Sequence, residues 1–166
     1  MLLTRVTLLA LALLMGGVAP QGTSDSPFNL ERLATCRDSW FEWKDDQARM
    51  TAIVAGLQAA YHQQQDTDAF VVPNQKTTLL GLPVLRVFPN SIGMAVGFSV
   101  MVSGSFDAAK KAVEGTIHKP LGKCEANDEM RTCSLEIAEK KALLLLGDSN
   151  GKSKEVLVGW FDFYEK

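Results

Sequence analysis

The feature that most constrains the fold of this sequence is residues 94–102, where larger apolar and smaller side chains alternate. Apolar residues stand at 94, 96, 98, 100 and 102, and small residues stand at 95, 97 and 99. Alternation with a period of two, carried by β-branched and aromatic residues, is typical of a strand with one face on a core. The end of the chain repeats the pattern, because residues 96–98 and 158–160 both read Val-Gly-aromatic. We therefore expect two equivalent strands in two related halves.

Two helices are predicted between and before these strands. Ser39 and Glu42 fit a capping box, and apolar residues then recur at steps of three and four as far as Tyr61. A second amphipathic segment begins after Ser105 and ends before Pro120. The remaining segments are short and rich in β-formers, and hairpin-like connections favour antiparallel pairing.

The predicted fold class is therefore α+β: an antiparallel β-sheet covered on one face by two helices. We expect residues 39–166 to form a single α+β domain, with 39–103 and 104–166 as candidate α-β-β-β half-repeats. The alternative is that two similar strands meet similar core demands without an internal duplication.

The N-terminus has the pattern of a secretory signal peptide. Arg5 precedes an apolar run over residues 6–15, and small residues follow up to Ala19. We expect cleavage after Ala19, with residues 20–38 as a leader segment and the mature protein in the periplasm or outside the cell. The run is shorter than the roughly 20 residues that span a bilayer, so no stable membrane anchor is expected. The alternative is a buried N-terminal helix.

Export makes the three cysteines informative, because disulfides persist in oxidising compartments. Cys124 and Cys133 flank a polar loop, and we predict a disulfide between them. Pairing of Cys36 with either of them is the alternative.

The sequence contains no recognised motif for catalysis, metal binding or nucleic-acid binding. The formal net charge is −2 and becomes −3 without Arg5, so no basic patch favours nucleic acid as a partner. The two histidines, His62 and His118, lack partners at metal-ligand spacing, and no cofactor motif occurs. No nucleophile motif occurs either, although Cys36 with a distant histidine would satisfy the bare inventory of a thiol enzyme. We therefore predict no catalytic residues, no metal and no cofactor.

The C-terminal strand is apolar on both faces, and it supplies the candidate binding residues. A strand of that kind is either covered on both sides within the fold or presents aromatic side chains to a partner. The candidates are Trp160, Phe161, Phe163 and Tyr164. We expect an exported non-catalytic protein that binds another protein, as an inhibitor, immunity or accessory factor.

Two alternative functions remain open from the sequence. One is a carrier of a small apolar ligand, with a cavity lined by Trp40, Trp43, Phe98 and Trp160. The other is a small hydrolase without a recognisable motif, whose site would need a cleft holding a perturbed acid or histidine.

Overall fold

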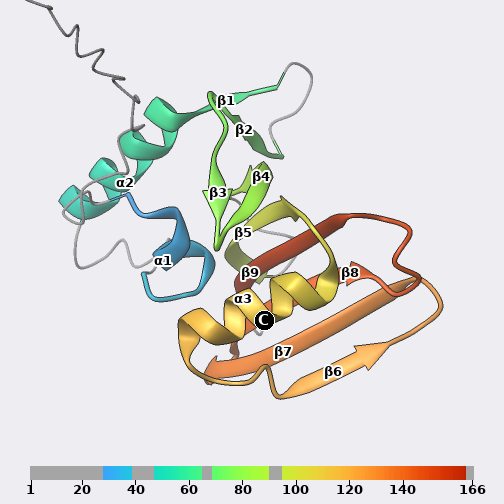
Figure 1. Cartoon of the computed structure of the whole chain (residues 1–166). Helices are drawn as coiled ribbons and strands as arrows, with labels where there is room; N and C mark the ends of the chain where they lie inside the picture. The colour runs from blue at the N-terminus through green and yellow to red at the C-terminus, as the bar shows by residue number, and fades with distance from the viewer. Residues whose placement is uncertain (1–27, 39–46, 65–68, 90–94, 164–166) are drawn as a thin grey trace, which may run out of the picture.

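A computed structural model describes residues 28–38, 47–64, 69–89 and 95–163 (Figure 1). The described residues form three helices and nine strands. The helices are α1 (Leu30–Ala34), α2 (Gln47–Ala60) and α3 (Phe106–Ile117). The strands are β1 (Tyr61–Gln63), β2 (Val71–Pro73), β3 (Thr78–Leu79), β4 (Leu82–Phe88), β5 (Ala95–Ser103), β6 (Lys123–Ala126), β7 (Met130–Ala138), β8 (Lys141–Asp148) and β9 (Glu155–Phe163).

The strands form one antiparallel sheet in the order β1-β2-β4-β5-β9-β8-β7-β6, and β3 pairs with β4 beside this path. The predicted α+β class with an antiparallel sheet is confirmed. The two Val-Gly-aromatic strands are direct neighbours at the centre: β5 pairs with β9 along its whole length, and Phe98 lies opposite Trp160.

The helices pack against the sheet in an arrangement that differs from the predicted one. Helix α3 lies across β8 and β9, and the short helix α1 contacts β5 and β9 (Figure 1). Helix α2 instead contacts the edge strand β1. The expectation that the two long helices cover one face is therefore not confirmed. The predicted helix start at Ser39, with Trp40 and Trp43, lies outside the described residues.

Helix α3 begins and ends where its sequence predicts. The Ser105 side chain caps it by accepting a hydrogen bond from the Ala108 N–H at 3.2 Å. Its apolar face buries Phe106, Ala109 and Val113. The helix ends at Ile117, where the next residue adopts the left-handed conformation.

The core lies between the sheet and the helices, and all three helices contribute buried residues to it. Phe98 and Trp160 are fully buried at its centre, and the Trp160 indole N–H donates a hydrogen bond to the Leu33 carbonyl at 2.7 Å. Leu33 and Ala34 are themselves fully buried. Residues 28–38, which the sequence analysis placed in a leader segment, thus pack into the same core.

A buried carboxylate joins the first two helices. Asp38, 8% exposed, accepts hydrogen bonds from Arg32, at 3.0 Å, and from Arg49 of α2. Two opposed guanidinium groups compensate the cost of burying this charge.

Strands β3 and β4 form a hairpin whose turn lies at residues 80 and 81. Leu80 (φ 54°) and Gly81 (φ 78°) form a two-residue turn with both residues in the left-handed region, the geometry that hairpins favour. The register of β4 against β5 shifts between Val84 and Arg86. A β-bulge of this kind bends the strand that carries it.

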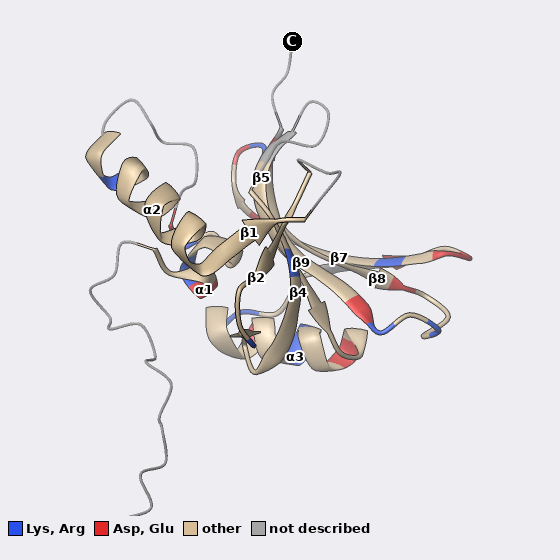
Figure 2. Ribbon diagram, turned by 90° about the horizontal axis from the view of Figure 1, so that it is seen from above, with Lys and Arg blue, Asp and Glu red and all other residues tan. Residues whose placement is uncertain are grey.

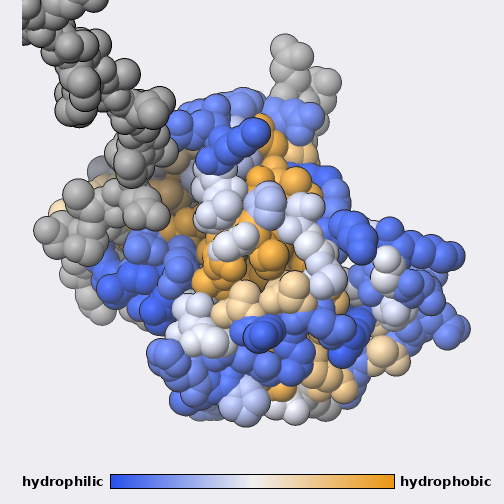
Figure 3. All heavy atoms as spheres, in the orientation of Figure 1, coloured by the Kyte–Doolittle hydropathy of each residue, from blue (hydrophilic) through white to orange (hydrophobic). Residues whose placement is uncertain are grey.

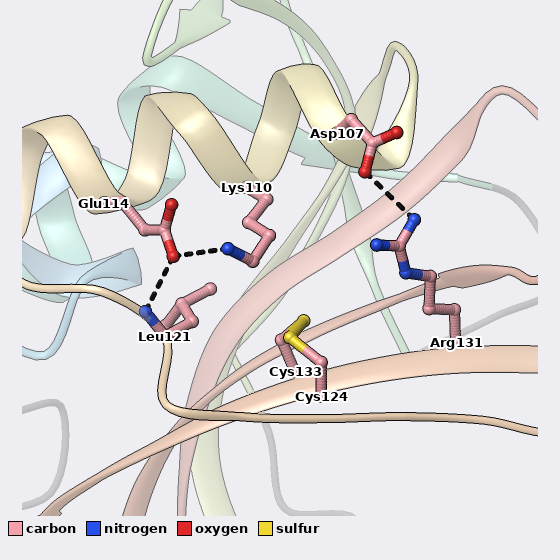
Figure 4. Close-up of a disulfide and its surroundings, with 7 residues drawn as sticks. All are labelled: Asp107, Lys110, Glu114, Leu121, Cys124, Arg131 and Cys133. Carbon is pink, nitrogen blue, oxygen red and sulfur yellow. Dashed lines mark hydrogen bonds and ion pairs between the residues drawn. A yellow bond between two sulfur atoms is a disulfide. The ribbon is translucent and has the colours of Figure 1, made fainter.

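The predicted disulfide between Cys124 and Cys133 is present (Figure 4). The two residues lie directly opposite each other on β6 and β7, with Cα atoms 4.0 Å apart. Close to it, a Glu114 carboxylate oxygen accepts hydrogen bonds from Lys110 Nζ (2.6 Å) and the Leu121 N–H (2.8 Å), which together hold the pKa of Glu114 below its usual range.

No helix in the described part of the chain is long and apolar enough to cross a membrane. The predicted signal peptide, residues 1–19, lies outside the described residues.

Candidate functional site: the outer face of the sheet

In the described part of the chain, the half of the sheet made by β5, β9, β8 and β7 has helices on one side only. On that side, Arg131 of β7 places its guanidinium carbon 4.5 Å from the centre of the Phe106 ring of α3, and Gly147 of β8 also faces that ring. Because successive side chains of a strand alternate between faces, Thr132 and Leu146 point to the other side. Figure 2 shows α3 on one side of these strands and no described helix on the other. We call the side away from α3 the outer face.

An apolar row crosses the outer face at right angles to the strands. Met101 of β5 pairs with Leu157 of β9, Leu157 pairs with Leu146 of β8, and Leu146 pairs with Thr132 of β7. Leu144 lies two residues from Leu146 on the same face. All five side chains are half-buried. Side chains directly opposite each other in a sheet are in contact, so the row is continuous.

The composition of β8 sets this face apart from an ordinary solvated sheet. Residues 143–146 are four leucines: Leu143 and Leu145 are fully buried in the core, whereas Leu144 and Leu146 are on the outer face. An antiparallel strand with one face in water normally alternates apolar and polar residues. The outer face of β8 lacks that alternation.

Charged groups stand at both ends of the apolar row. Arg86 of β4 pairs in register with Met101, and its guanidinium lies 2.9 Å from the Glu155 carboxylate of β9. At the far end, Glu125 of the edge strand β6 pairs in register with Thr132. The row is thus an apolar centre with charged margins, the usual anatomy of a protein interface.

The loop that joins β8 to β9 is fixed by its own hydrogen bonds. Asp148 accepts hydrogen bonds from the backbone N–H groups of Ser153 and Asn150, both at 2.8 Å, and these bonds hold the pKa of Asp148 below its usual range. The Asn150 amide donates to the Asp128 carbonyl at 2.7 Å, which ties this loop to the β6–β7 turn. These bonds anchor the strand ends beside the outer face.

The structure describes the side chains of two of the four predicted binding residues, Trp160 and Phe161, and they lie on opposite faces of β9. Trp160 faces the core, is 1% exposed and has its indole N–H bonded, so it does not reach the surface. Phe161 is on the outer side, opposite Gly97, and is 6% exposed. The side chain of Phe163 and the whole of Tyr164 lie outside the described residues.

Sequence reasoning missed the residues that form the apolar row. Leu144 and Leu146 had a signal, since a run of four leucines in a strand must place two on each face. No sequence pattern pointed to Met101, because its neighbour on the outer face is Leu157 of β9, more than fifty residues further along the chain.

The cavity expected for an apolar ligand is not formed by the two core aromatic residues. Phe98 and Trp160 are buried against other core residues, and Trp40 and Trp43 lie outside the described residues. Within the described ranges, no group of three His, Cys, Asp or Glu side chains is placed to hold a metal ion. His62 Nδ1 lies 2.7 Å from the Asn74 amide oxygen.

Comparison with known proteins gives no relative: no family model, curated protein or solved structure matches this chain.

Proposed function

We propose that this chain is an exported, non-catalytic protein that binds another protein through the outer face of its sheet. The observation that carries the proposal is the continuous apolar row of Met101, Leu157 and Leu146, on a face with no described helix. A contiguous apolar surface rimmed by polar groups marks an interaction site in a water-soluble protein.

The edges of the sheet favour a partner that lies flat on the outer face over one that adds a strand. The edge strand β6 has exposed residues and a charged Glu125, and β1 at the other edge is only three residues long. Short and charged edge strands disfavour pairing with another chain. The apolar row on the outer face is the more favourable surface for association.

Two features support export of the protein. The disulfide between Cys124 and Cys133 is compatible with an oxidising compartment. The sequence of residues 1–19 has the pattern of a signal peptide. The proposal places the mature chain in the periplasm or outside the cell, where an inhibitor, immunity or accessory factor would meet its partner.

The test is purification of the mature chain, residues 20–166, from its exported fraction under non-reducing conditions. We expect one protein to co-elute in a fixed stoichiometry with the wild-type chain. The double variant Leu146→Thr, Leu157→Thr should lose it, because threonine keeps the strand but removes apolar contact area. The matched control is Ile137→Thr, which changes an exposed apolar residue away from the row.

The result is decided by comparing the three chains. Each must first give the circular dichroism spectrum of the wild-type fold. Absence of any stoichiometric partner, or equal retention of the partner by wild type and the double variant, would refute binding through the outer face.

The internal duplication is a second part of the proposal. Residues 39–103 and 104–166 are proposed to be copies of one unit, supported by a strand order in which β5, β4, β2 and β1 mirror β9, β8, β7 and β6. Each series follows a helix, α2 or α3. An experimental structure whose two halves do not superpose strand for strand would contradict it.

A further inference from the structure

A cavity of about 370 Å³ lies away from the outer face, between the ends of two helices and the end of β7. The last turn of α3, the segment after α1 and strands β7 and β8 form its walls. Ligand sites in proteins commonly have volumes from about 300 to 1,000 Å³. At roughly 30 Å³ per water-sized atom, this cavity has room for about a dozen non-hydrogen atoms.

The β-strand side of the cavity is apolar. Leu143 of β8 is 1% exposed at its base, and Leu135 of β7 is half-buried. Ile117 of α3 closes the wall, and Ile137 is 44% exposed. Within the described residues, Ile137 is one of two large apolar side chains exposed to that degree. These four residues provide a surface for a short hydrocarbon chain.

The helix side of the cavity supplies hydrogen-bond donors and positive charge. Arg37 is held in place by an ion pair with Glu31 and by donation from Nε to Thr35 Oγ1 at 3.1 Å. A guanidinium has five N–H donors, so these two interactions leave others for a ligand. Lys119 and His118 follow α3 in the same lining. The one carboxylate in the lining, Glu136, belongs to the β7 side.

Both helix ends in this wall carry a side chain where glycine is usual. Cys36 follows α1 with φ 58°, and His118 follows α3 with φ 54°. A non-glycine residue in the left-handed region is strained, because its Cβ atom comes too close to the following carbonyl oxygen. Strained positions of this kind tend to cluster at functional sites. Here two of them line one cavity.

We propose that this cavity binds a short amphipathic carboxylate, with its hydrocarbon chain on Leu135, Leu143 and Ile137 and its carboxylate beside Arg37 and Lys119. The volume of the cavity matches a single short chain. Decanoate, with twelve non-hydrogen atoms in agreement with the estimated dozen, is the probe of choice. This site is separate from the outer face, so it stands whether or not a protein partner binds there.

The test is isothermal titration calorimetry of the full mature chain with linear carboxylates of increasing length. Each added methylene should tighten binding about fourfold until the cavity is filled, near decanoate, and further methylenes should add nothing. 1-Decanol should bind more weakly than decanoate, because it lacks the charge that the helix side favours. Failure of decanoate to bind at millimolar concentration, or equal affinity for decanol, would overturn the proposal.

Two pairs of variants locate the site. Lys119→Glu should weaken decanoate binding about two- to fivefold, whereas Lys111→Glu, the same charge change on the exposed side of α3, should not. Ile137→Thr should weaken it several-fold, whereas Met130→Thr, at an equally exposed position at the other end of β7, should not. Equal effects within either pair would show that decanoate binds elsewhere and would overturn the assignment.

Discussion

Replacement of Trp160 by phenylalanine tests how the N-terminal segment is held on the sheet. The indole N–H donates to the Leu33 carbonyl, 127 residues away along the chain, and Trp160 is 1% exposed. Leu33 belongs to α1, which also packs against β5 and β9. The hydrogen bond is thus a direct link between α1 and the centre of the sheet.

The expected loss of stability is moderate because the carbonyl keeps one partner. The Cys36 backbone N–H also donates to the Leu33 oxygen, at 3.3 Å. Loss of the indole bond should therefore cost about 1 kcal/mol, the net value of an ordinary hydrogen bond. The smaller ring leaves part of the buried indole volume empty, which adds about 1–2 kcal/mol. We expect Trp160→Phe to lower the free energy of unfolding by about 2–3 kcal/mol.

Urea denaturation followed by far-ultraviolet circular dichroism measures the change, provided that the denaturant slope stays constant. Trypsin should also cut faster after Arg32 and Arg37 in the variant, because these two residues flank Leu33. A benzothienyl-alanine at position 160 keeps the shape of the ring but lacks the N–H. It should therefore lower the free energy of unfolding by about 1 kcal/mol, the contribution of the hydrogen bond alone. A loss below about 0.5 kcal/mol for Trp160→Phe, with unchanged proteolysis, would refute this account of the α1 contact.

Three further predictions concern the disulfide, a buried tyrosine and the central glycine. Removing the disulfide with Cys124→Ser, Cys133→Ser should lower the free energy of unfolding by about 2–3 kcal/mol, because the bridge closes a loop with a sequence separation of 9. Urea titration measures this loss, and an unchanged unfolding midpoint would contradict the prediction. Burial raises the pKa of Tyr61 from 10.0 to about 12, so the contribution of Tyr61 to stability is complete below pH 10 and is lost as the pH rises toward 12. Tyr61→Phe should flatten this alkaline loss of stability in urea titrations at increasing pH. The variant should also lack the tyrosine that ionises late in the ultraviolet spectrum. Gly97→Ala places a methyl group 2.0 Å from a backbone oxygen of β9 and should lower the free energy of unfolding by about 1–3 kcal/mol. Gly115→Ala lies in open space on α3 and should raise it by about 0.5–1 kcal/mol. Thermal unfolding compares the two variants, and equal effects would contradict the close approach of β5 and β9.

Local signals account for the parts of the fold that could be predicted. The Ser105 cap and the spacing of apolar residues define α3, and both depend on residues within one helix. The disulfide depends on a spacing of nine residues, which a hairpin bridges. The alternation over residues 94–102 predicts a strand for the same reason.

Tertiary contacts decide the parts that could not be predicted. Alternation shows that β9 has two faces, but it does not show which face meets the helices; Trp160 therefore looked available to a partner and is instead a core residue. Residues 28–38 form only a five-residue helix, which is too short to show a periodic pattern of apolar residues. Their burial depends on the contact between Leu33 and Trp160, which are far apart in the sequence. The apolar row also depends on the register between distant strands, which no local pattern fixes.

The most direct test of the central claim is hydroxyl-radical footprinting of the outer face, with oxidation of Met101, Leu146 and Leu157 measured by mass spectrometry. The account predicts that these residues are oxidised in the isolated mature chain and protected when the co-purified partner is added, while Ile137 is oxidised equally in both samples. No oxidation of the row in the isolated chain would mean that the face is already covered. Equal oxidation with and without the partner would mean that the partner binds elsewhere, and either result would contradict binding through the outer face.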